Sequence, residues 1–475
     1  MQFNEEYFNS EEFQELLDSY ETAIASGSQP FMDADDFVDI ADYYSMVGDA
    51  DKASDVVKIA LQLYPHATLP NVFKARGALQ DGDIEAAQRF AKNIESKDDP
   101  DYHYLVAEIM IAQGRIDDGD RYLRDYSRSV DADEYQDFVK DCANLYVDYG
   151  ISDKAYEWMM RSKGDNSDDF KELMARTLFG LGKYKDSERI FNELIDHNPY
   201  SKRYWNALAS AQFLNEEYNA SVTSSEYVLA IDPADPEGLL SKANALLRLG
   251  NYEEAMDYYQ RYDRIVPNDE FSLLNQGICL INLGRLEEAL PLLEKVATMP
   301  TSEPTVLPQV YQELAFCYSN KGDIDKALEM LDRTQELPCD HIDMMVVRGH
   351  ILLENGLSVE AEAAYKQAMH LSNNSPAVIL RIIVSIYDNH FVTISYQMFK
   401  VFFKVVSAHI PDFKNGYAYM ALCCYDLDKG DEFLSYLKKA VDANPQEAQL
   451  VLSELFPEGM EVTDYYPYME KRLKN

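Results

Sequence analysis

The sequence predicts an all-α protein built as a solenoid of antiparallel helix pairs. Three observations predict it: a period of about 34 residues, two columns of small residues in register, and a glycine at most of the expected turns. Residues 236–269 show the pattern, with one amphipathic helix ending at Gly250, a second beginning near Tyr252, and Pro267 near the close. Glycine adopts a left-handed conformation at little cost, so the chain can reverse tightly there.

The two columns of small residues lie at positions 8 and 20 of each repeat, counted from Pro236 as position 1. Position 8 is small in every repeat except at Ile383, and position 20 is small in every repeat except at Phe433. Small side chains at facing positions let the axes of two paired helices approach closely. The repeats begin at Ala34, Thr68, Pro100, Gln136, Asp168, Lys202, Pro236, Glu270, Pro308, Ile342, Pro376 and Lys414.

This period and pattern resemble the tetratricopeptide repeat, with about twelve repeats covering most of the chain. The resemblance implies a right-handed superhelical solenoid whose concave groove, lined by the first helices, binds peptides. The fold alone does not name a partner, because it supports many functions.

Taken in order, the chain begins with a capping segment, residues 1–33, that contains a predicted helix over 10–25. Repeats one to eight follow in 34–303, repeats nine to twelve in 304–447, and a capping helix (448–456) with a tail in 448–475. The turns of repeats six and eleven lack glycine and carry Glu216 and His390 instead. The proline-rich stretch 299–308 suggests either a hinge between two halves or a long loop within one continuous solenoid.

The net charge of −40 makes nucleic acid and anionic membranes unfavourable partners. The acids either keep a long surface soluble or attract a basic partner. The N-terminus shows no signal-peptide pattern, no apolar run is long enough to span a membrane, and the cysteines lack metal-type spacing, so we expect a cytoplasmic protein with reduced cysteines.

No nucleophile motif, phosphate loop or dinucleotide fingerprint is present, so we expect no catalytic or cofactor-binding site. His350 and Glu354, with Asp343 nearby, could form a metal site, but such pairs are common on solvated helix faces and we expect no metal.

The candidate binding surface is the stripe formed by positions 2, 5, 9, 12 and 13 of the first helices. Its early part is largely acidic, with Asp35, Asp42, Asp101 and Glu108 around Arg76. Its middle part is apolar with interspersed Arg and Asn, which is typical of an interface, although neighbouring repeats could also bury it. The predicted peptide-binding residues are Arg176, Phe179, Arg203, Asn206, Phe213, Leu240, Asn244, Leu247, Arg248, Leu274, Ile278 and Phe316.

We expect an apolar partner segment with some acidic groups, oriented by Arg176, Arg203 and Arg248. Some family members hold peptide C-termini in a clamp of Lys and Asn. Lys140 and Asn144 resemble half of such a clamp, but the following repeats lack the rest, so we do not expect binding of chaperone tails.

The leading hypothesis is a non-catalytic scaffold that binds a protein or peptide segment in its groove. Two alternatives stay open: a structural solenoid that self-assembles into a homo-oligomer, and a regulatory subunit of an enzyme complex.

Overall fold

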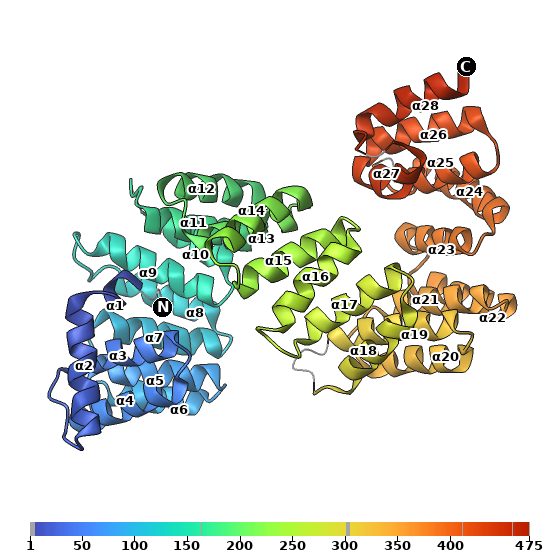
Figure 1. Cartoon of the computed structure of the whole chain (residues 1–475). Coiled ribbons are helices and arrows are strands. Elements are labelled where there is room, and N and C mark those ends of the chain that lie inside the picture. The colour runs from blue at the N-terminus through green and yellow to red at the C-terminus, as the bar shows by residue number, and fades with distance from the viewer. Residues whose placement is uncertain (1–4, 163, 301–304, 411, 458, 475) are drawn as a thin grey trace. The chain divides into compact units, whose positions relative to one another are not determined.

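A computed structural model describes residues 5–162, 164–300, 305–410, 412–457 and 459–474 (Figure 1). The regular elements of these residues are all helices, and no strand occurs among them, which confirms the all-α prediction. The chain divides into two compact units, Met1–Ile231 and Asp232–Asn475, called here the N-terminal and C-terminal units. The expected interruption at 299–308 and the expected boundary at 303/304 overlap residues 301–304, which lie outside the described residues.

The N-terminal unit contains a short helix, a capping helix and six helix pairs. Its helices are α1 (Glu5–Phe8), α2 (Glu11–Ala25), α3 (Ala34–Met46), α4 (Ala50–Leu63), α5 (Thr68–Gln80), α6 (Ile84–Asn93), α7 (Pro100–Ala112), α8 (Ile116–Tyr126), α9 (Tyr135–Asp148), α10 (Ser152–Met159), α11 (Asp168–Gly180), α12 (Tyr184–His197), α13 (Lys202–Leu214) and α14 (Tyr218–Ile231).

The C-terminal unit contains six further pairs and the closing helices. They are α15 (Pro236–Arg248), α16 (Tyr252–Asp263), α17 (Glu270–Asn282), α18 (Leu286–Thr298), α19 (Val306–Asn320), α20 (Ile324–Arg333), η1 (Thr334–Glu336), α21 (His341–Glu354), α22 (Ser358–Leu371), α23 (Pro376–Asp388), α24 (Val392–His409), α25 (Tyr417–Asp426), α26 (Gly430–Ala443), α27 (Pro445–Leu452), η2 (Ser453–Leu455), η3 (Val462–Asp464) and α28 (Tyr465–Lys474).

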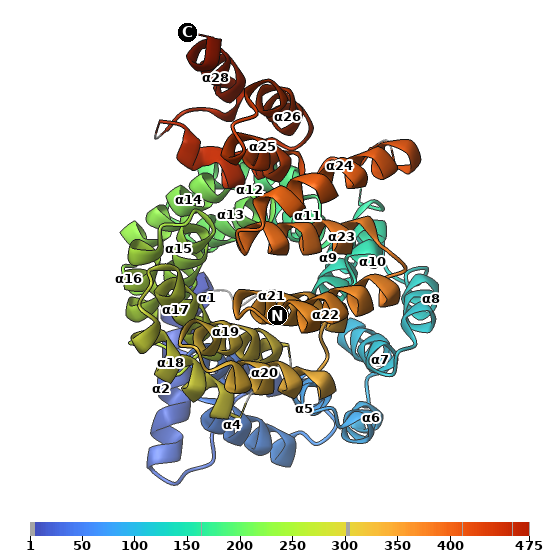
Figure 2. The ribbon, with the colours of Figure 1, turned by 90° about the vertical axis from the view of Figure 1, so that its right-hand side faces the viewer.

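Within each unit the pairs stack in chain order. The first and second helices of a repeat lie side by side, as α19 and α20 do and as α21 and α22 do (Figures 1 and 2). The first helices also contact the next first helix, for example α3 with α5 and α17 with α19. One layer is therefore made of first helices, and its outward stripe is called here the first-helix face.

The two small columns are the places where paired helices meet. Ala243 on α15 and Ala255 on α16 are both fully buried. In two of the three repeats with serine at position 20, the hydroxyl donates across the pair to the carbonyl at position 8: Ser187 to Ala175 and Ser221 to Ala209, each at 2.9 Å. This bond satisfies the buried hydroxyl in these two repeats, whereas the buried hydroxyl of Ser395 has no hydrogen-bond partner among the described residues.

The turn between paired helices uses the left-handed conformation even where glycine is missing. Glu216 has a φ of 63° and His390 a φ of 65°, against 78° for Gly250 in the same repeat position. Asp428 at the last turn behaves likewise, with a φ of 55°. Because the next helix must reverse, repeat packing imposes this conformation despite a cost of about 1–2 kcal/mol for a residue with a Cβ.

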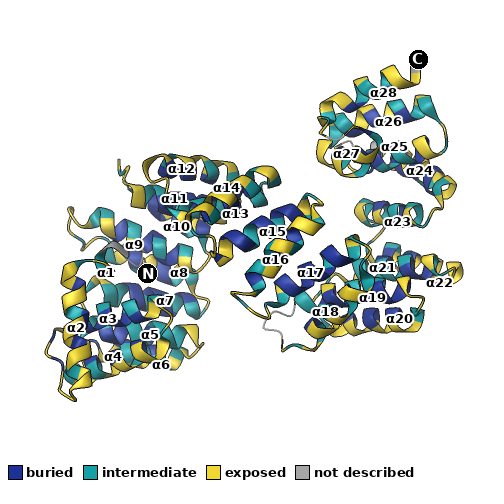
Figure 3. Ribbon diagram, in the orientation of Figure 1, coloured by how far each residue is buried: buried dark blue, intermediate teal, exposed yellow. Residues whose placement is uncertain are grey.

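The cores lie between the packed helices, and along each helix buried residues of the inner side alternate in sequence with exposed residues of the outer side (Figure 3). All six cysteines are free thiols; five are buried, and Cys339 is half-buried. Burial raises the pKa of each thiol, to about 12 for Cys279 and Cys317. Because the thiolate is the reactive form, these buried thiols should react slowly.

Candidate protein-binding face

The first-helix face carries the predicted peptide-binding residues, and the two units are treated in turn. In the N-terminal unit, Arg176 and Phe179 lie on α11 and Arg203, Asn206 and Phe213 on α13. Phe179 and Phe213 are half-buried, and each packs edge-on against a tyrosine that begins the second helix of its repeat, Tyr184 and Tyr218. In the C-terminal unit, α15 carries Leu240, Asn244, Leu247 and Arg248, α17 carries Leu274 and Ile278, and α19 carries Phe316.

Two of the predicted residues are not available on the surface. Leu274 is only 1% exposed and belongs to a core cluster with Val310 and Leu314 of α19. Asn206 is also buried, at 5% exposed. The prediction of these two as peptide-binding residues is corrected: both occupy position 5, and in these two repeats that position is buried, whereas Leu240 at the same position of α15 stays half-exposed.

Two arginines expected to orient a ligand already have carboxylate partners. Arg176 Nη2 lies 3.2 Å from Asp148 Oδ1, and Arg203 forms an ion pair with the buried Glu172. Lys140, half of the incomplete clamp, pairs with Asp137 at 2.8 Å. A ligand carboxylate would therefore compete with internal acids at these positions. Arg248 is exposed at the end of α15.

The early part of the face is a half-buried cluster of acids around one arginine. Arg76 on α5 binds Glu108 on α7 through two nitrogens, with Nε 2.9 Å and Nη2 2.5 Å from Oε1. Burial raises the pKa of Asp42 to about 6, and it also raises the pKa of Asp101 and of Asp141. This part of the face disfavours anionic ligands.

The C-terminal unit has an apolar first-helix face instead. Leu240, Leu247, Ile278 and Phe316 are half-buried, and Phe271 is 45% exposed. Phe316 also contacts the ring of His350 edge-on, with centroids 5.8 Å apart. Asn244 is engaged within its own repeat, because its Oδ1 accepts a hydrogen bond of 2.6 Å from Tyr259.

Comparison with protein-family models matches three parts of the chain. Residues 173–236 and 308–337 match tetratricopeptide-repeat models, and residues 214–296 match the model of subunit 3 of the anaphase-promoting complex, or cyclosome. The chain therefore carries tetratricopeptide repeats. Repeats of this family serve as scaffolds for protein–protein interaction, which suggests protein partners for this chain.

Solved structures of tetratricopeptide-repeat proteins are similar to the chain at low identity. A tetratricopeptide-repeat protein from Parabacteroides merdae is 15% identical, covers 53% of this chain and 98% of its own, and has a TM-score of 0.44. The Cut9–Hcn1 hetero-tetramer of the APC/C is 14% identical over 93% of this chain and 92% of its own, with a TM-score of 0.36. A thermophilic tetratricopeptide-repeat protein from Thermus thermophilus is 20% identical over 39% of this chain and 100% of its own, with a TM-score of 0.32. Among curated proteins none matches this chain.

One half-buried acid, Glu313 on α19, was not predicted from the sequence. Its burial raises its pKa to about 7. Among the described residues no cation pairs with it. The signal that could have found it is an acid flanked by Val310 and Cys317, which are one helical turn away on either side.

We expect Glu313→Gln to stabilise the protein at neutral and alkaline pH. A pKa that is raised in the folded state means that folding favours the protonated acid, so the free energy of unfolding of the parent falls as pH rises from about 4.5 to about 7 and then levels off. The glutamine side chain of the variant does not ionise, so its free energy of unfolding does not fall in this way as the pH rises. Above pH 7 the variant should be more stable by about 1–3 kcal/mol, and below pH 4.5 the difference should vanish.

Urea denaturation between pH 4 and pH 8 measures this difference. The matched control is Glu336→Gln, which changes an exposed acid in η1 and should leave the pH profile unchanged. A Glu313→Gln profile parallel to that of the parent would show that Glu313 ionises as freely in the fold as in the unfolded chain.

The residues considered for a metal site make other contacts. His350 Nδ1 lies 3.0 Å from Ser385 Oγ, and Glu354 accepts a hydrogen bond of 2.6 Å from Ser319. Within the described ranges, no cluster of three or more potential metal ligands occurs. In the same part of the chain, every helix is too short or too polar to cross a membrane.

Proposed function

We propose that this protein is a non-catalytic scaffold that holds a segment of a protein partner in a groove along its first-helix face. One observation carries the proposal: apolar side chains at positions 5, 9 and 12 of the stripe, on consecutive first helices, keep part of their surface open. In the C-terminal unit these are Leu240 and Leu247 on α15, Ile278 on α17 and Phe316 on α19. Half-exposed apolar residues in a row indicate an interface.

The proposed partner segment is apolar and carries a few acidic groups. Arg248 is placed at the edge of the apolar row, where a guanidinium can bind a carboxylate through two hydrogen bonds. We propose the same role for four residues of the N-terminal unit: Phe179, Phe213, Arg176 and Arg203. On binding, each of these arginines leaves its carboxylate partner within the protein and pairs with a carboxylate of the partner segment. With a net charge of −40, nucleic acid and membrane lipid are not proposed as partners.

A second candidate is a regulatory or structural subunit of a larger complex. The match of residues 214–296 to a subunit model of the anaphase-promoting complex supports it. Both candidates use the same face. In the second, the partner is a permanent neighbour and the area buried is larger. A homo-oligomer remains the third possibility and is tested by the mass of the protein in solution.

We expect Leu247→Ala/Phe316→Ala to weaken partner binding by about 1–3 kcal/mol for each residue that acts as a hot spot. Both side chains are half-buried on the first-helix face, so the fold should tolerate their truncation. Affinity capture from a lysate of the source organism, quantified for parent and variant, identifies the proteins whose recovery depends on this face.

The matched control is Val359→Ala/Leu371→Ala, which removes apolar surface from α22, a second helix, at positions 78% and 50% exposed. Partners should be retained by this control and lost by the first-helix variant. Equal recovery by all three proteins, with unchanged circular dichroism, would place the binding surface elsewhere. Unfolding of the first-helix variant would assign the two side chains to the core.

A further inference from the structure

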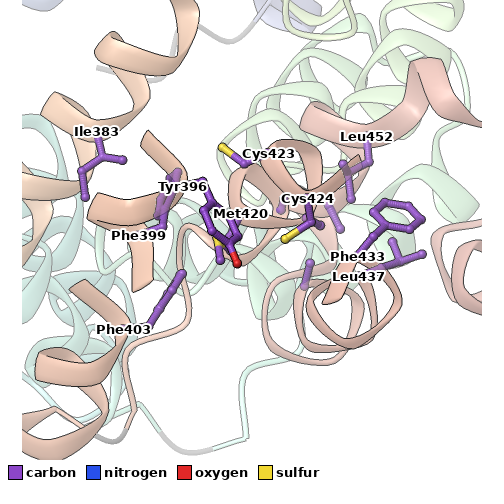
Figure 4. Close-up of a cluster of buried hydrophobic side chains, with 14 of the residues drawn as sticks. Ile383, Tyr396, Phe399, Phe403, Met420, Cys423, Cys424, Phe433, Leu437 and Leu452 are labelled. Carbon is purple, nitrogen blue, oxygen red and sulfur yellow. The ribbon is translucent and has the colours of Figure 1, made fainter. Parts of the chain in front are cut away.

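The second helix of repeat eleven, α24, is apolar on two opposite sides. With 18 residues it is the longest helix of the described chain. Its inner side buries Tyr396, Phe399 and Phe403 in a core cluster that includes Met420 of α25 and Phe433 of α26 (Figure 4). This side accounts for the attachment of α24 to the rest of the C-terminal unit.

The outer side of α24 carries a second apolar stripe that nothing in the described part of the C-terminal unit covers. Ile394 is 52% exposed, Val401 64% and Val405 53%. They are spaced seven and four residues apart, so they lie in one row along the helix. A helix that is apolar all round is normally buried on all sides. Single exposed apolar residues need no explanation, whereas a continuous row on one face indicates an interaction surface.

The charges beside this stripe differ from those of the rest of the protein. The helix contains no Asp or Glu, although the whole chain carries 83 acidic residues and a net charge of −40. Lys400 and Lys404 are exposed beside Val401 and Val405. Lys400 donates to the Tyr396 hydroxyl at 3.4 Å, and Lys404 forms no ion pair with any described residue.

By contrast, the second helices of the adjoining repeats carry acids. These are Glu360 and Glu362 in α22 and Asp431, Glu432 and Asp442 in α26. The absence of acids is therefore particular to α24 within this part of the C-terminal unit. An apolar row flanked by lysines is complementary to an apolar row flanked by carboxylates.

We propose that the outer side of α24 docks an amphipathic helix of a partner protein, whose apolar row packs on Ile394, Val401 and Val405 and whose flanking acids pair with Lys400 and Lys404. A helix fits because the row is straight, and two helices pack their ridges into each other's grooves over such a row. The site is separate from the first-helix face, so it holds independently of the proposed function.

Two other occupants fit the observations less well. A second copy paired through its own α24 would bring lysines against lysines and gain no ion pairs. An anionic membrane would meet two lysines on a chain of net charge −40, and the long-range repulsion would oppose its approach. Both occupants are nevertheless distinguishable outcomes of the experiment below.

The test uses the full chain and two designed helical peptides labelled with fluorescein. Both peptides carry the same leucine row; one has glutamates beside it and the other has lysines. Fluorescence anisotropy should show binding of the glutamate peptide and little binding of the lysine peptide. Val401→Gln/Val405→Gln should weaken the glutamate peptide about tenfold or more, because exposed residues at the centre of an interface carry most of its affinity.

The second part of the experiment reverses the charges of the two lysines beside the stripe. Lys400→Glu/Lys404→Glu should turn the preference toward the lysine peptide, and Val359→Gln on α22 should change neither affinity. These surface changes should leave the circular dichroism spectrum and the thermal midpoint as in the parent.

Three results would overturn the proposal. The first is equal affinity of parent and Val401→Gln/Val405→Gln for the glutamate peptide. The second is flotation with vesicles of phosphatidylcholine and phosphatidylserine that the same variant abolishes, which would assign the stripe to a membrane. The third is a dimer mass in light scattering that falls to the monomer mass in this variant, which would assign it to a second copy.

Discussion

Ala255→Arg should lower the free energy of unfolding by about 3–5 kcal/mol, the loss expected for an uncompensated buried charge. Ala255 is fully buried on α16 where it meets Ala243 of α15, and neither side chain leaves room for a longer one. The guanidinium would have to separate the two helices or remain buried without a partner. Either outcome damages the pair, and the damage should spread first to the adjoining α17, because repeats are stabilised mainly by their neighbours.

Hydrogen exchange followed by mass spectrometry resolves this loss along the chain. Peptides from α15, α16 and α17 should lose protection, while those from α3 to α6 should keep it. Gln260→Arg is the matched control, since it places the same side chain at an exposed position of the same helix and should cost little. An Ala255→Arg protein as stable as the control would mean that positions 8 and 20 do not face each other.

Trp158→Ala should cost about 3–5 kcal/mol, a typical loss for truncating a large buried aromatic residue. Trp158 on α10 is fully buried, packs edge-on against Phe138 with centroids 5.8 Å apart, and donates its indole N–H to Asp120 at 3.0 Å. Removing the side chain leaves a cavity among α8, α9 and α10. Chemical denaturation followed by circular dichroism measures the loss, and hydrogen exchange should place it in these three helices.

Trp158→Phe separates packing from hydrogen bonding. It keeps an aromatic ring against Phe138 and removes only the N–H donor, while Asp120 retains its ion pair with Arg124 at 2.6 Å. The expected cost is about 1–2 kcal/mol. If Trp158→Phe were as damaging as Trp158→Ala, the hydrogen bond to Asp120 would carry most of the contribution.

The fold could be predicted from the sequence because its determinants are local. Small residues at positions 8 and 20, with a turn residue at position 15, specify how one helix pairs with the next. The same pattern recurs in each repeat. The first helices accordingly begin within three residues of their expected starts. Glu216 and His390 show the limit of residue type as a guide, since both adopt the glycine conformation because the flanking helices require it.

Which residues are exposed on the first-helix face was predicted less completely, because exposure there depends on contacts between repeats. The stripe of positions 2, 5, 9, 12 and 13 identified Leu247, Ile278 and Phe316 as surface residues. Position 5 is covered where the adjoining first helix carries bulky residues, as at Leu274. The hydrophobic period of one helix does not reveal which residues the adjoining helix places against it. The ion pairs of Arg176 with Asp148 and of Arg203 with Glu172 also join different repeats, so spacing within one helix could not reveal them.

The six free thiols give the molecule a built-in set of chemical reporters. A thiol must ionise and meet its reagent before it reacts, and five of the six are buried with raised pKa values. Modification of the intact protein by an alkylating agent should thus begin at the half-buried Cys339. Each further adduct then records the opening of a particular stretch of the array: Cys142 for α9, Cys279 for α17, Cys317 for α19, and Cys423 with Cys424 for α25. The order in which the cysteines are alkylated therefore shows which helices open first.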